Sequence, residues 1–493
     1  MQPTPEQTAI GIENFYAAIG SPLLRRDFLK ECNAAELSSG NGLGAKYFGY
    51  GTVDKPVNVA FLGTGDEGSI LLGAINPKYI RVVAIADIRP YSVWRAFHGD
   101  NYTPDIKKLR TGLIDKYGWK DESEARNNVR VYSDYKELFE KEKDNNDPAT
   151  KIEAVVIALP LFLHAPAAVA AMKAGYHVLT EKLMGHTVAN CKEMARAAEL
   201  YQKHLATGHQ RHYNVLYDHA IKMLQSGVMG NLHYIRAQWH RNNRPGSDSW
   251  QQPMPKAAKP EDGRQTGRLE KELASWQDAR KKAEAAGKSK EVESWDIKIA
   301  QKESQIADSV LVEGGEWRGY KFKSAKDYGY QDEPKYVVED MKIPYNRPAI
   351  EELIRWRLYN RTSAGLMAEL GSHQLDAASI FIAAMHGGKK QYPLSVSCTE
   401  TRSIFPATIE GSSLDRDVND HIHCIFDYAA DGYDPNDELG KQRKITVAYS
   451  SINGNGFGGY GETVFGTKGT LLIDREQQAS LYRGAGIEDK IKI

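Results

Sequence analysis

The chain has 493 residues, of which 41% are hydrophobic and 26% are charged. This composition is typical of a soluble globular protein, and the length favours two domains or one domain with large insertions. Lysine plus arginine and aspartate plus glutamate each total 64, so bulk charge indicates neither nucleic acid nor an anionic membrane as a partner. No apolar run approaches the roughly 18 residues that a membrane-spanning helix needs.

Two features bear on the cellular compartment. Four scattered cysteines without a CxxC pair favour reduced thiols in a cytoplasmic enzyme over a disulfide framework or a zinc site; they are Cys32, Cys191, Cys398 and Cys424. The stretch "LLRRDFLKEC" (23–32) resembles a twin-arginine export motif, but the apolar segment that such a signal needs does not follow it. We interpret it as a short amphipathic helix in an N-terminal arm (1–55), and we expect a cytoplasmic protein, with the periplasm as the alternative.

Residues 56–212 alternate short β-rich runs with helical ones, which predicts βαβ units and a doubly wound parallel sheet. Several of the runs are almost uniformly apolar, as is typical of strands that helices cover on both faces. The expected strands are 57–63, 80–87, 128–133, 152–160, 176–182 and 204–209. Helices fit between them at 165–175 and at 187–203, where Thr187 is a candidate N-cap.

Residues 213–493 differ in character and predict an α+β domain built on a mostly antiparallel sheet. A helix at 215–231 is followed by strand-like runs at 232–242, 394–405, 420–428, 444–451 and 461–474. A charge-rich insertion at about 244–348 interrupts these runs. Its centre (268–310) has helical apolar spacing on both sides of the turn "AAGKSK", which predicts an αα-hairpin. The pattern is compatible with a lid or a subunit contact, and equally with a solvated surface element.

The stretch "FLGTGDEGSILL" (61–72) contains a Gly-x-Gly-x-x-Gly spacing, Gly63 to Gly68, between an expected strand and an expected helix. Glycines permit a tight turn and close approach of the backbone, and the helix N-terminus offers free N–H groups to a diphosphate. Asp87 ends the second strand, where a carboxylate binds the adenosine ribose and repels a 2′-phosphate. This context predicts NAD binding, with NADP as the alternative because Arg89 follows two residues later.

Two carboxylates, Asp66 and Glu67, lie inside this loop. Backbone N–H groups bind the diphosphate in such loops, and acids in a first helical turn favour the positive end of the helix dipole. We therefore expect neutral replacements of both acids to leave NAD binding intact or tighter.

The stretch 158–187 contains a strand, then Pro160, His164 at the start of a helix, "GYHV" at 175–178 and the pair Glu181–Lys182. This arrangement resembles the Gfo/Idh/MocA family of sugar oxidoreductases, which includes glucose–fructose oxidoreductase and inositol dehydrogenase. The stretches "GHQRHYNVLY" (208–217) and "FGTKGTLLID" (465–474) resemble the family as well. Leu183 lies where the family has a proline that is prone to the cis form.

The resemblance implies an NAD-binding Rossmann domain (56–212), followed by a second domain (213–493) with a large open sheet through which dimers or tetramers form. It also implies a cofactor site. The candidate cofactor residues are Gly63, Thr64, Gly65, Glu67, Gly68, Asp87, Ile88, Pro160, His164, Glu181, Lys182 and Arg211.

The stretch "AELGSHQLDAASIF" (368–381) resembles the family pattern Asp-x-Gly-x-His-x-x-Asp, with Glu369 in the first position followed by His373 and Asp376. In the family, this histidine and the lysine equivalent to Lys182 surround the sugar hydroxyl. Oxidation of a secondary alcohol requires hydride transfer and a group that accepts the hydroxyl proton, and a lysine or histidine tuned toward neutral pKa can accept it. Lys182 and His373 are therefore the candidate catalytic pair, oriented by Glu369 and Asp376. Which of the two is the base stays open.

The stretch "QWHRNNRPG" (238–246) places aromatic, amide and guanidinium groups at a strand end, a combination that suits carbohydrate binding. The candidate substrate residues are Trp239, His240, Arg241, Asn242 and Gln374. His421 and His423 share a strand face, but we expect no metal there because no third ligand is visible.

These observations predict an NAD-dependent oxidoreductase that acts on a hydroxyl of a small carbohydrate: a sugar, an inositol or a glycoside. A first alternative is a glycosidase with tightly bound NAD, which would oxidise a ring carbon, eliminate the aglycone and reduce the ring again. A second alternative is a sugar-binding sensor without catalytic activity. We expect a homo-oligomer with no nucleic-acid or membrane partner.

Overall fold

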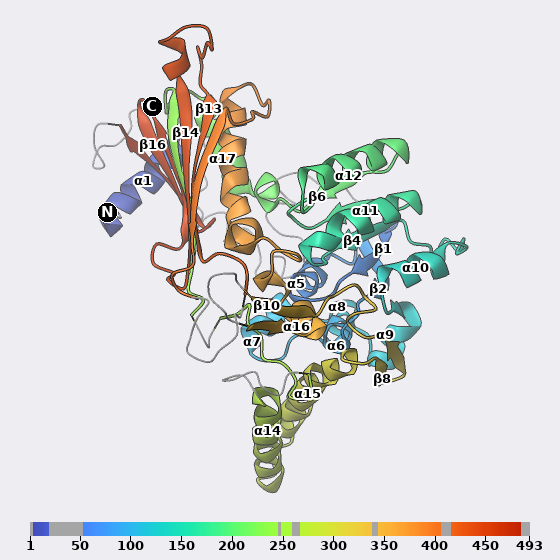
Figure 1. Cartoon of the computed structure of the whole chain (residues 1–493). Coiled ribbons are helices and arrows are strands. Elements are labelled where there is room, and N and C mark those ends of the chain that lie inside the picture. The colour runs from blue at the N-terminus through green and yellow to red at the C-terminus, as the bar shows by residue number, and fades with distance from the viewer. Residues whose placement is uncertain are drawn as a thin grey trace.

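The computed structural model describes residues 3–18, 53–244, 248–258, 267–337, 344–405 and 416–484. Two large sheets lie on opposite sides of helix α17 (Ser372–Met385), and a helical hairpin projects away from both (Figure 1). The stretch 23–32, which we interpreted as an amphipathic helix or an export motif, lies outside the described residues. In the described part of the chain, no helix combines the length and the apolar character needed to cross a bilayer.

The first sheet is the predicted doubly wound parallel sheet, with strand order β3-β2-β1-β4-β5-β6. All six strands lie where the sequence predicts them: β1 Val57–Leu62, β2 Ile80–Ala86, β3 Arg130–Tyr132, β4 Ala154–Ile157, β5 His177–Thr180 and β6 Leu205–Thr207. The helices of this part are α5 Asp66–Ala74, α6 Pro90–His98, α7 Pro104–Leu109, α8 Leu113–Tyr117, α9 Glu122–Asn128, α10 Tyr135–Glu142, α11 His164–Lys173 and α12 Val188–Leu200.

Burial on both faces explains why these strands are apolar throughout. In β1, Val59 and Phe61 belong to one core cluster, whereas Ala60 and Leu62 belong to a second cluster on the other face. Successive side chains of a strand point to opposite faces, so both faces of the sheet are covered. The predicted N-cap is also present, because the side chain of Thr187 accepts a hydrogen bond from the backbone N–H of Asn190.

The second sheet has seven strands in the order β12-β13-β14-β7-β15-β16-β17. Every neighbouring pair is antiparallel except the central pair β14–β7. Helices α13 (Val215–Gln225) and α17 cover one face and share its core cluster. The strands are β7 Leu232–Arg241, β12 Ser395–Thr401, β13 His421–Ala429, β14 Lys444–Asn453, β15 Tyr460–Gly466, β16 Gly469–Asp474 and β17 Gln478–Arg483.

The sequence predicted this sheet incompletely. The expected run 461–474 is a hairpin of β15 and β16, and β17 was not predicted. Helix α1 (Pro5–Ala18) also belongs to this part of the fold, because Phe15 is fully buried in the same core cluster. The Nδ2 group of Asn14 donates a hydrogen bond to the carbonyl oxygen of Leu481, 3.1 Å away in β17. The N-terminal helix therefore packs on the second sheet.

The insertion contains the predicted hairpin, formed by α14 (Arg268–Ala285) and α15 (Ser289–Ala307). At its base, the buried side chain of Gln301 donates to Asp100 (2.9 Å) and accepts from the backbone N–H of Asn101 (2.8 Å). These contacts attach the hairpin to the Rossmann domain beside α6. The remaining elements of this region are β8 Gly315–Trp317, β9 Tyr320–Phe322, β10 Glu333–Val337, β11 Pro344–Arg347 and α16 Ala349–Ile354.

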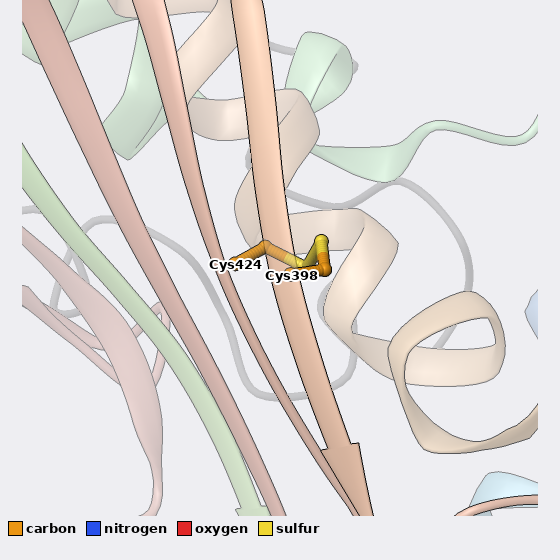
Figure 2. The surroundings of a disulfide bond; sticks show 2 residues. All are labelled: Cys398 and Cys424. Carbon is orange, nitrogen blue, oxygen red and sulfur yellow. A yellow bond between two sulfur atoms is a disulfide. The ribbon is translucent and has the colours of Figure 1, made fainter.

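A disulfide between Cys398 and Cys424 shows that the expectation of reduced thiols is wrong for these two cysteines. The residues are 26 positions apart in sequence, but they lie directly opposite each other in the antiparallel pair β12–β13 (Figure 2). Their Cα atoms are 4.2 Å apart, closest to the roughly 4.5 Å of a non-hydrogen-bonded pair in antiparallel strands. Sequence spacing did not reveal the pair because strand register brings it together.

We predict that replacing both Cys398 and Cys424 by alanine lowers the free energy of unfolding by about 3 kcal/mol, because a cross-link over a loop of this length restricts the unfolded chain. Urea unfolding without reductant measures the change, with the free thiol Cys191→Ala as the matched control. Peptide mapping under non-reducing conditions should recover the linked pair of peptides. Complete alkylation of both cysteines before reduction would contradict the bond.

Candidate functional site

A cavity of about 660 Å³ lies between the two sheets. The carboxyl ends of the parallel strands, the start of α17, the end of β7 and the insertion all contribute to its wall. Ligands of doubly wound folds bind outside the carboxyl ends of the strands, and this volume is in the usual range for small-molecule sites.

The glycine loop has the local geometry that a diphosphate requires. Gly63 adopts a φ of +85°, and a Cβ there would lie 2.5 Å from the carbonyl oxygen of Ala158. A Cβ at Gly68 would lie 2.2 Å from the carbonyl oxygen of Gly63. Gly65, in contrast, faces open space and caps α5 without a side-chain hydrogen bond to the helix. Free backbone N–H groups beside open space fit a dinucleotide.

Asp87 lines the same cavity at the end of β2. Its carboxylate accepts hydrogen bonds from the backbone N–H groups of Thr64 (2.7 Å) and Arg89 (2.9 Å). Burial raises the pKa of Asp87, although these hydrogen bonds and the charge of Arg89 oppose the rise. The carboxylate is thus fixed between the glycine loop and the strand end, where a ribose hydroxyl would bind.

Arg89 is held by the insertion. Its Nε and Nη2 groups lie 3.0 and 2.7 Å from one carboxylate oxygen of Asp308, which follows α15. The other oxygen of Asp308 accepts the backbone N–H of Tyr91 at 3.1 Å. Asp308 is only 1% exposed. Arg89 is the residue for which the sequence left NADP as an alternative cofactor, and it is already paired with a buried acid.

Asp66 has a role that the sequence did not indicate. Its carboxylate accepts hydrogen bonds from Arg95 (3.0 Å) and Gln252 (3.0 Å), and Arg357 lies 3.8 Å away. Burial alone would raise the pKa of Asp66, but the charges of Arg95, Arg357 and Arg110 outweigh it and keep the pKa below its ordinary value. Asp66 therefore joins the Rossmann domain to two later parts of the chain.

Glu67 and Glu181 both line the cavity. Burial, with a further contribution from the charge of Glu67, raises the pKa of Glu181 to about 7. Glu181 also packs closely against the backbone after β6, since a Cβ at Gly208 would lie 2.8 Å from its Oε1.

The turn after β5 places Lys182 in the cavity. The Lys182–Leu183 peptide bond is cis although residue 183 is not proline. The ring nitrogens of His164 lie 2.7 Å from the carbonyl oxygen of Leu183 and 2.8 Å from that of Leu159. The buried His164 thus ties this turn to the end of β4, and Pro160 lines the cavity beside it.

Lys182 follows strand β5 of the parallel sheet, and His373 lies in helix α17 beside the second sheet. Both residues line the cavity. The Nζ group of Lys182 donates a hydrogen bond to the backbone oxygen of Glu369, in the π-helical turn Met367–Gly371 that precedes α17. His373 follows one turn later and lies with its ring centroid 6.0 Å from that of Trp239. Burial, with the nearby charges of Arg211, Lys182 and His209, lowers the pKa of His373 to about 2, so its imidazole is neutral near pH 7.

Several candidate residues do not line the cavity. Gln374 is fully buried beside Glu462, and Arg211 is buried with its Nη2 group 2.7 Å from Glu476. Asp376 instead pairs with His212 at 3.2 Å. Four more candidate residues lie outside the cavity wall. Thr64 and Gly68 shape the glycine loop, His240 contacts the carbonyl oxygen of Phe457, and Asn242 is exposed.

The cavity also contains residues that the sequence did not single out. The insertion and the segment after it contribute Trp250, Gln252, Tyr330, Trp356 and Arg357. A weak signal exists in "RWR" (355–357), which repeats the tryptophan–arginine combination of the stretch at 238–241. Within the described ranges, no group of three histidine, cysteine or acidic side chains is arranged to hold a metal ion.

Residues 57–209 match the profile of the oxidoreductase family with an NAD-binding Rossmann fold, GFO_IDH_MocA. Among curated proteins, the uncharacterized oxidoreductase YdgJ of Escherichia coli K12 is 30% identical over 25% of this chain and 36% of its own length. A glycosyl hydrolase family 109 protein of Solibacter usitatus is 23% identical over 45% of this chain and 46% of its own. For an inositol 2-dehydrogenase of Corynebacterium glutamicum the values are 34%, 22% and 31%.

The chain thus spans roughly a third to a half of the length of the curated relatives it matches. Among solved structures, an aldose–aldose oxidoreductase from Caulobacter crescentus has a TM-score of 0.43 and 17% identity, over 86% of this chain and 80% of that one. A levoglucosan dehydrogenase has a TM-score of 0.45 and 14% identity, over 87% of this chain and 77% of that one.

The network around Asp66 changes the expectation for the loop acids. We predict that Asp66→Asn lowers the free energy of unfolding by about 1–3 kcal/mol, because the buried Arg95 loses the nearer of its two acid partners, Asp66 at 3.0 Å and Asp100 at 3.9 Å. Glu67→Gln is the matched control one residue away, and it should leave stability unchanged. Chemical denaturation of both variants measures the difference. Equal stability of Asp66→Asn and the parent protein would show that the network contributes nothing.

The Arg89–Asp308 pair predicts a change in cofactor preference. In Asp308→Asn, Arg89 is released, and we expect the affinity for NADP⁺ to rise about tenfold relative to NAD⁺ because a charge-assisted contact to the 2′-phosphate becomes available. Titration calorimetry with both cofactors measures the ratio. Adding Arg89→Ala to this variant should abolish the gain, and a gain that persists would assign it to another residue.

Proposed function

We propose, on the premise that residues 57–209 match the oxidoreductase family with an NAD-binding Rossmann fold, that the protein transfers hydride between NAD and a hydroxyl-bearing carbon of a sugar, inositol or glycoside. The observation that carries the proposal is the meeting of Lys182 and His373 in the cavity that also contains the glycine loop. Inositol 2-dehydrogenases among the relatives support a polyol or sugar as the substrate class.

Lys182 is the proposed base of this reaction. The strongly lowered pKa of His373 makes its protonated form costly, so His373 is poorly suited to accept the proton that leaves the hydroxyl. We assign to Lys182 the removal of the hydroxyl proton, and to neutral His373 a hydrogen bond that orients the hydroxyl. When bound, NAD⁺ supplies the acceptor for the hydride that leaves the same carbon.

Glu369 holds this arrangement in place. Its backbone oxygen accepts the hydrogen bond of Lys182 Nζ, and its Oε1 accepts the hydroxyl of Ser363 at 2.7 Å. The side chain of Trp239 is stacked on Tyr460 with ring centroids 4.1 Å apart, and it offers a flat apolar wall beside His373. Such a wall suits the apolar face of a sugar ring.

The second candidate function is glycoside cleavage through a transient oxidation of the sugar ring. Two relatives named as glycosyl hydrolase family 109 proteins, 23% and 27% identical to this chain, favour it. Both functions use the same base and the same cofactor site. They differ in whether reduced cofactor accumulates.

Three further features of the protein are proposals. The division into domains at 56–212 and 213–493 follows the two sheets, with α1 assigned to the second. Assembly as a dimer or tetramer would use the open sheet of the second domain. The disulfide favours an oxidising compartment such as the periplasm, the alternative to the cytoplasm, because disulfides are rare in reducing compartments.

The experiment begins with the purified protein and an assay for NAD released on denaturation. Incubation with p-nitrophenyl glycosides without added cofactor then tests glycoside cleavage, and incubation with free sugars and NAD⁺ tests oxidation. Release of p-nitrophenol without net NADH supports the glycosidase, and stoichiometric NADH supports the dehydrogenase. If neither product forms with any sugar, the proposed function is wrong.

We predict that Lys182→Ala and Lys182→Arg both lower kcat/KM about 1,000-fold, the typical contribution of a positioned base. Arginine keeps the positive charge but does not deprotonate, so it separates proton transfer from electrostatic attraction. Steady-state kinetics, with the substrate that the preceding assays identify, measure the loss of kcat/KM. Activity of Lys182→Arg close to that of the parent would exclude Lys182 as the base.

A further inference from the structure

Two arginines line the part of the cavity that contains the candidate catalytic pair. Arg241 ends β7, two residues after Trp239 and therefore on the same face of the strand. Arg357 lies with its Nε group 3.4 Å from Oε2 of Glu369, the residue whose backbone oxygen receives Lys182. Arg357 is thus connected to Lys182 through Glu369, and Arg241 lines the same cavity as Trp239 and His373.

Arg241 has hydrogen bonds but no carboxylate partner. Its Nε and Nη2 groups donate to Asn243 (3.3 Å) and to Ser249 (3.0 Å), both uncharged. Among the described residues, no acid forms an ion pair with it, and the nearby Asp248 is bound by Arg416 at 2.7 Å. Burial and the neighbouring charge of Arg357 lower the pKa of Arg241, so the charged guanidinium is held in an unfavourable environment.

Arg357 is only loosely paired. Its acid partners are Glu369 at 3.4 Å and Asp66 at 3.8 Å, and it donates no hydrogen bond to any other residue that the structure describes. Glu369 is already bonded to Ser363, and Asp66 to Arg95 and Gln252. The side chain of Arg357 remains 22% exposed in the cavity, so its fork is available to a ligand.

Tryptophan rings hold both guanidinium groups in position. The Cζ atom of Arg357 lies 4.3 Å above the ring of Trp356, and that of Arg241 lies 5.8 Å from the ring of Trp250. Both rings line the cavity. Stacking restricts the long side chains before a ligand arrives, which lowers the entropy cost of binding.

A half-buried guanidinium without an ion-pair partner, as in Arg241, is costly, and the nearby positive charge of Arg357 adds repulsion. Arginine forks match the geometry of carboxylate and phosphate oxygens. We propose that Arg241 and Arg357 form an oxyanion subsite, and that the substrate is an acidic sugar, either a uronic acid or a sugar phosphate, bound with its charged group between them. This inference rests on the proposed function for the identity of the sugar, but not for the binding itself.

The test is a binding titration of the NAD-loaded protein that does not depend on turnover. Trp239, Trp250 and Trp356 line the cavity, so tryptophan fluorescence should report occupancy. The probes are the gluco, galacto and manno forms of the uronic acid, of the 6-phosphate and of the neutral sugar. We expect at least one acidic form to bind about tenfold or more tightly than its neutral counterpart, with a preference that weakens as salt increases.

Variants assign the effect to the two arginines. Arg241→Gln and Arg357→Gln should each weaken binding of the acidic probe about tenfold and leave the neutral counterpart unchanged. Arg241→Lys keeps the charge without the fork and should recover part of the loss, which also guards against misfolding of the glutamine variant. Arg196→Gln on exposed α12 is the matched control. Thermal unfolding verifies that each variant is folded.

The outcomes separate this inference from the proposed function. Tighter binding of the uronic acid than of the phosphate, or the reverse, identifies the anion. Acidic sugars that bind but are neither oxidised nor cleaved leave the subsite standing and contradict the proposed function. Equal binding of acidic and neutral forms, failure of every acidic probe to bind, or turnover of neutral sugars only would overturn the subsite.

Discussion

The carboxylate of Asp66 is the contact on which the geometry of the candidate site depends. It lies in the first turn of the helix that follows the glycine loop, and it receives Arg95 from the Rossmann domain and Gln252 from the insertion. Arg357 approaches it from the segment that leads to the second sheet. One acid thus links the cofactor loop, the wall of the cavity and the arginine beside Glu369. A surface ion pair would contribute little, but here the arginine is buried and only 3% of its side chain is exposed.

The insertion is a structural part of the site. Its base attaches to the Rossmann domain through Gln301 and Asp308, and its later residues, among them Tyr330, close the cavity over the cofactor end. These residues and the carboxyl ends of the parallel strands line the same cavity. The helical hairpin extends beyond this contact, away from both sheets (Figure 1).

Local patterns predicted much of the fold. All six Rossmann strands, the cap at Thr187 and the hairpin of the insertion lie where the sequence places them, because each depends on periodicity or on residues close in the chain. Features set by long-range packing were missed. The Cys398–Cys424 bond depends on strand register, the expected run 461–474 contains the turn between β15 and β16, and the burial of Gln374 depends on the sheet beneath α17. For the site, the sequence motifs predicted that Lys182 and His373 share one site, and both line the cavity. Trp356 and Arg357 belong to no motif, and only the three-dimensional course of the chain after the insertion shows that they line the cavity.

The packing of α1 on β17 has a consequence for synthesis of the chain. The contact between Asn14 and Leu481 spans 467 residues, so the apolar face of α1 is covered only after β17 has been synthesised. The Rossmann sheet lies entirely between these two segments and can fold in the meantime, since domains generally fold as units during translation. Completion of the second core, and with it the wall of the cavity formed by β7 and α17, therefore comes after synthesis of the Rossmann sheet.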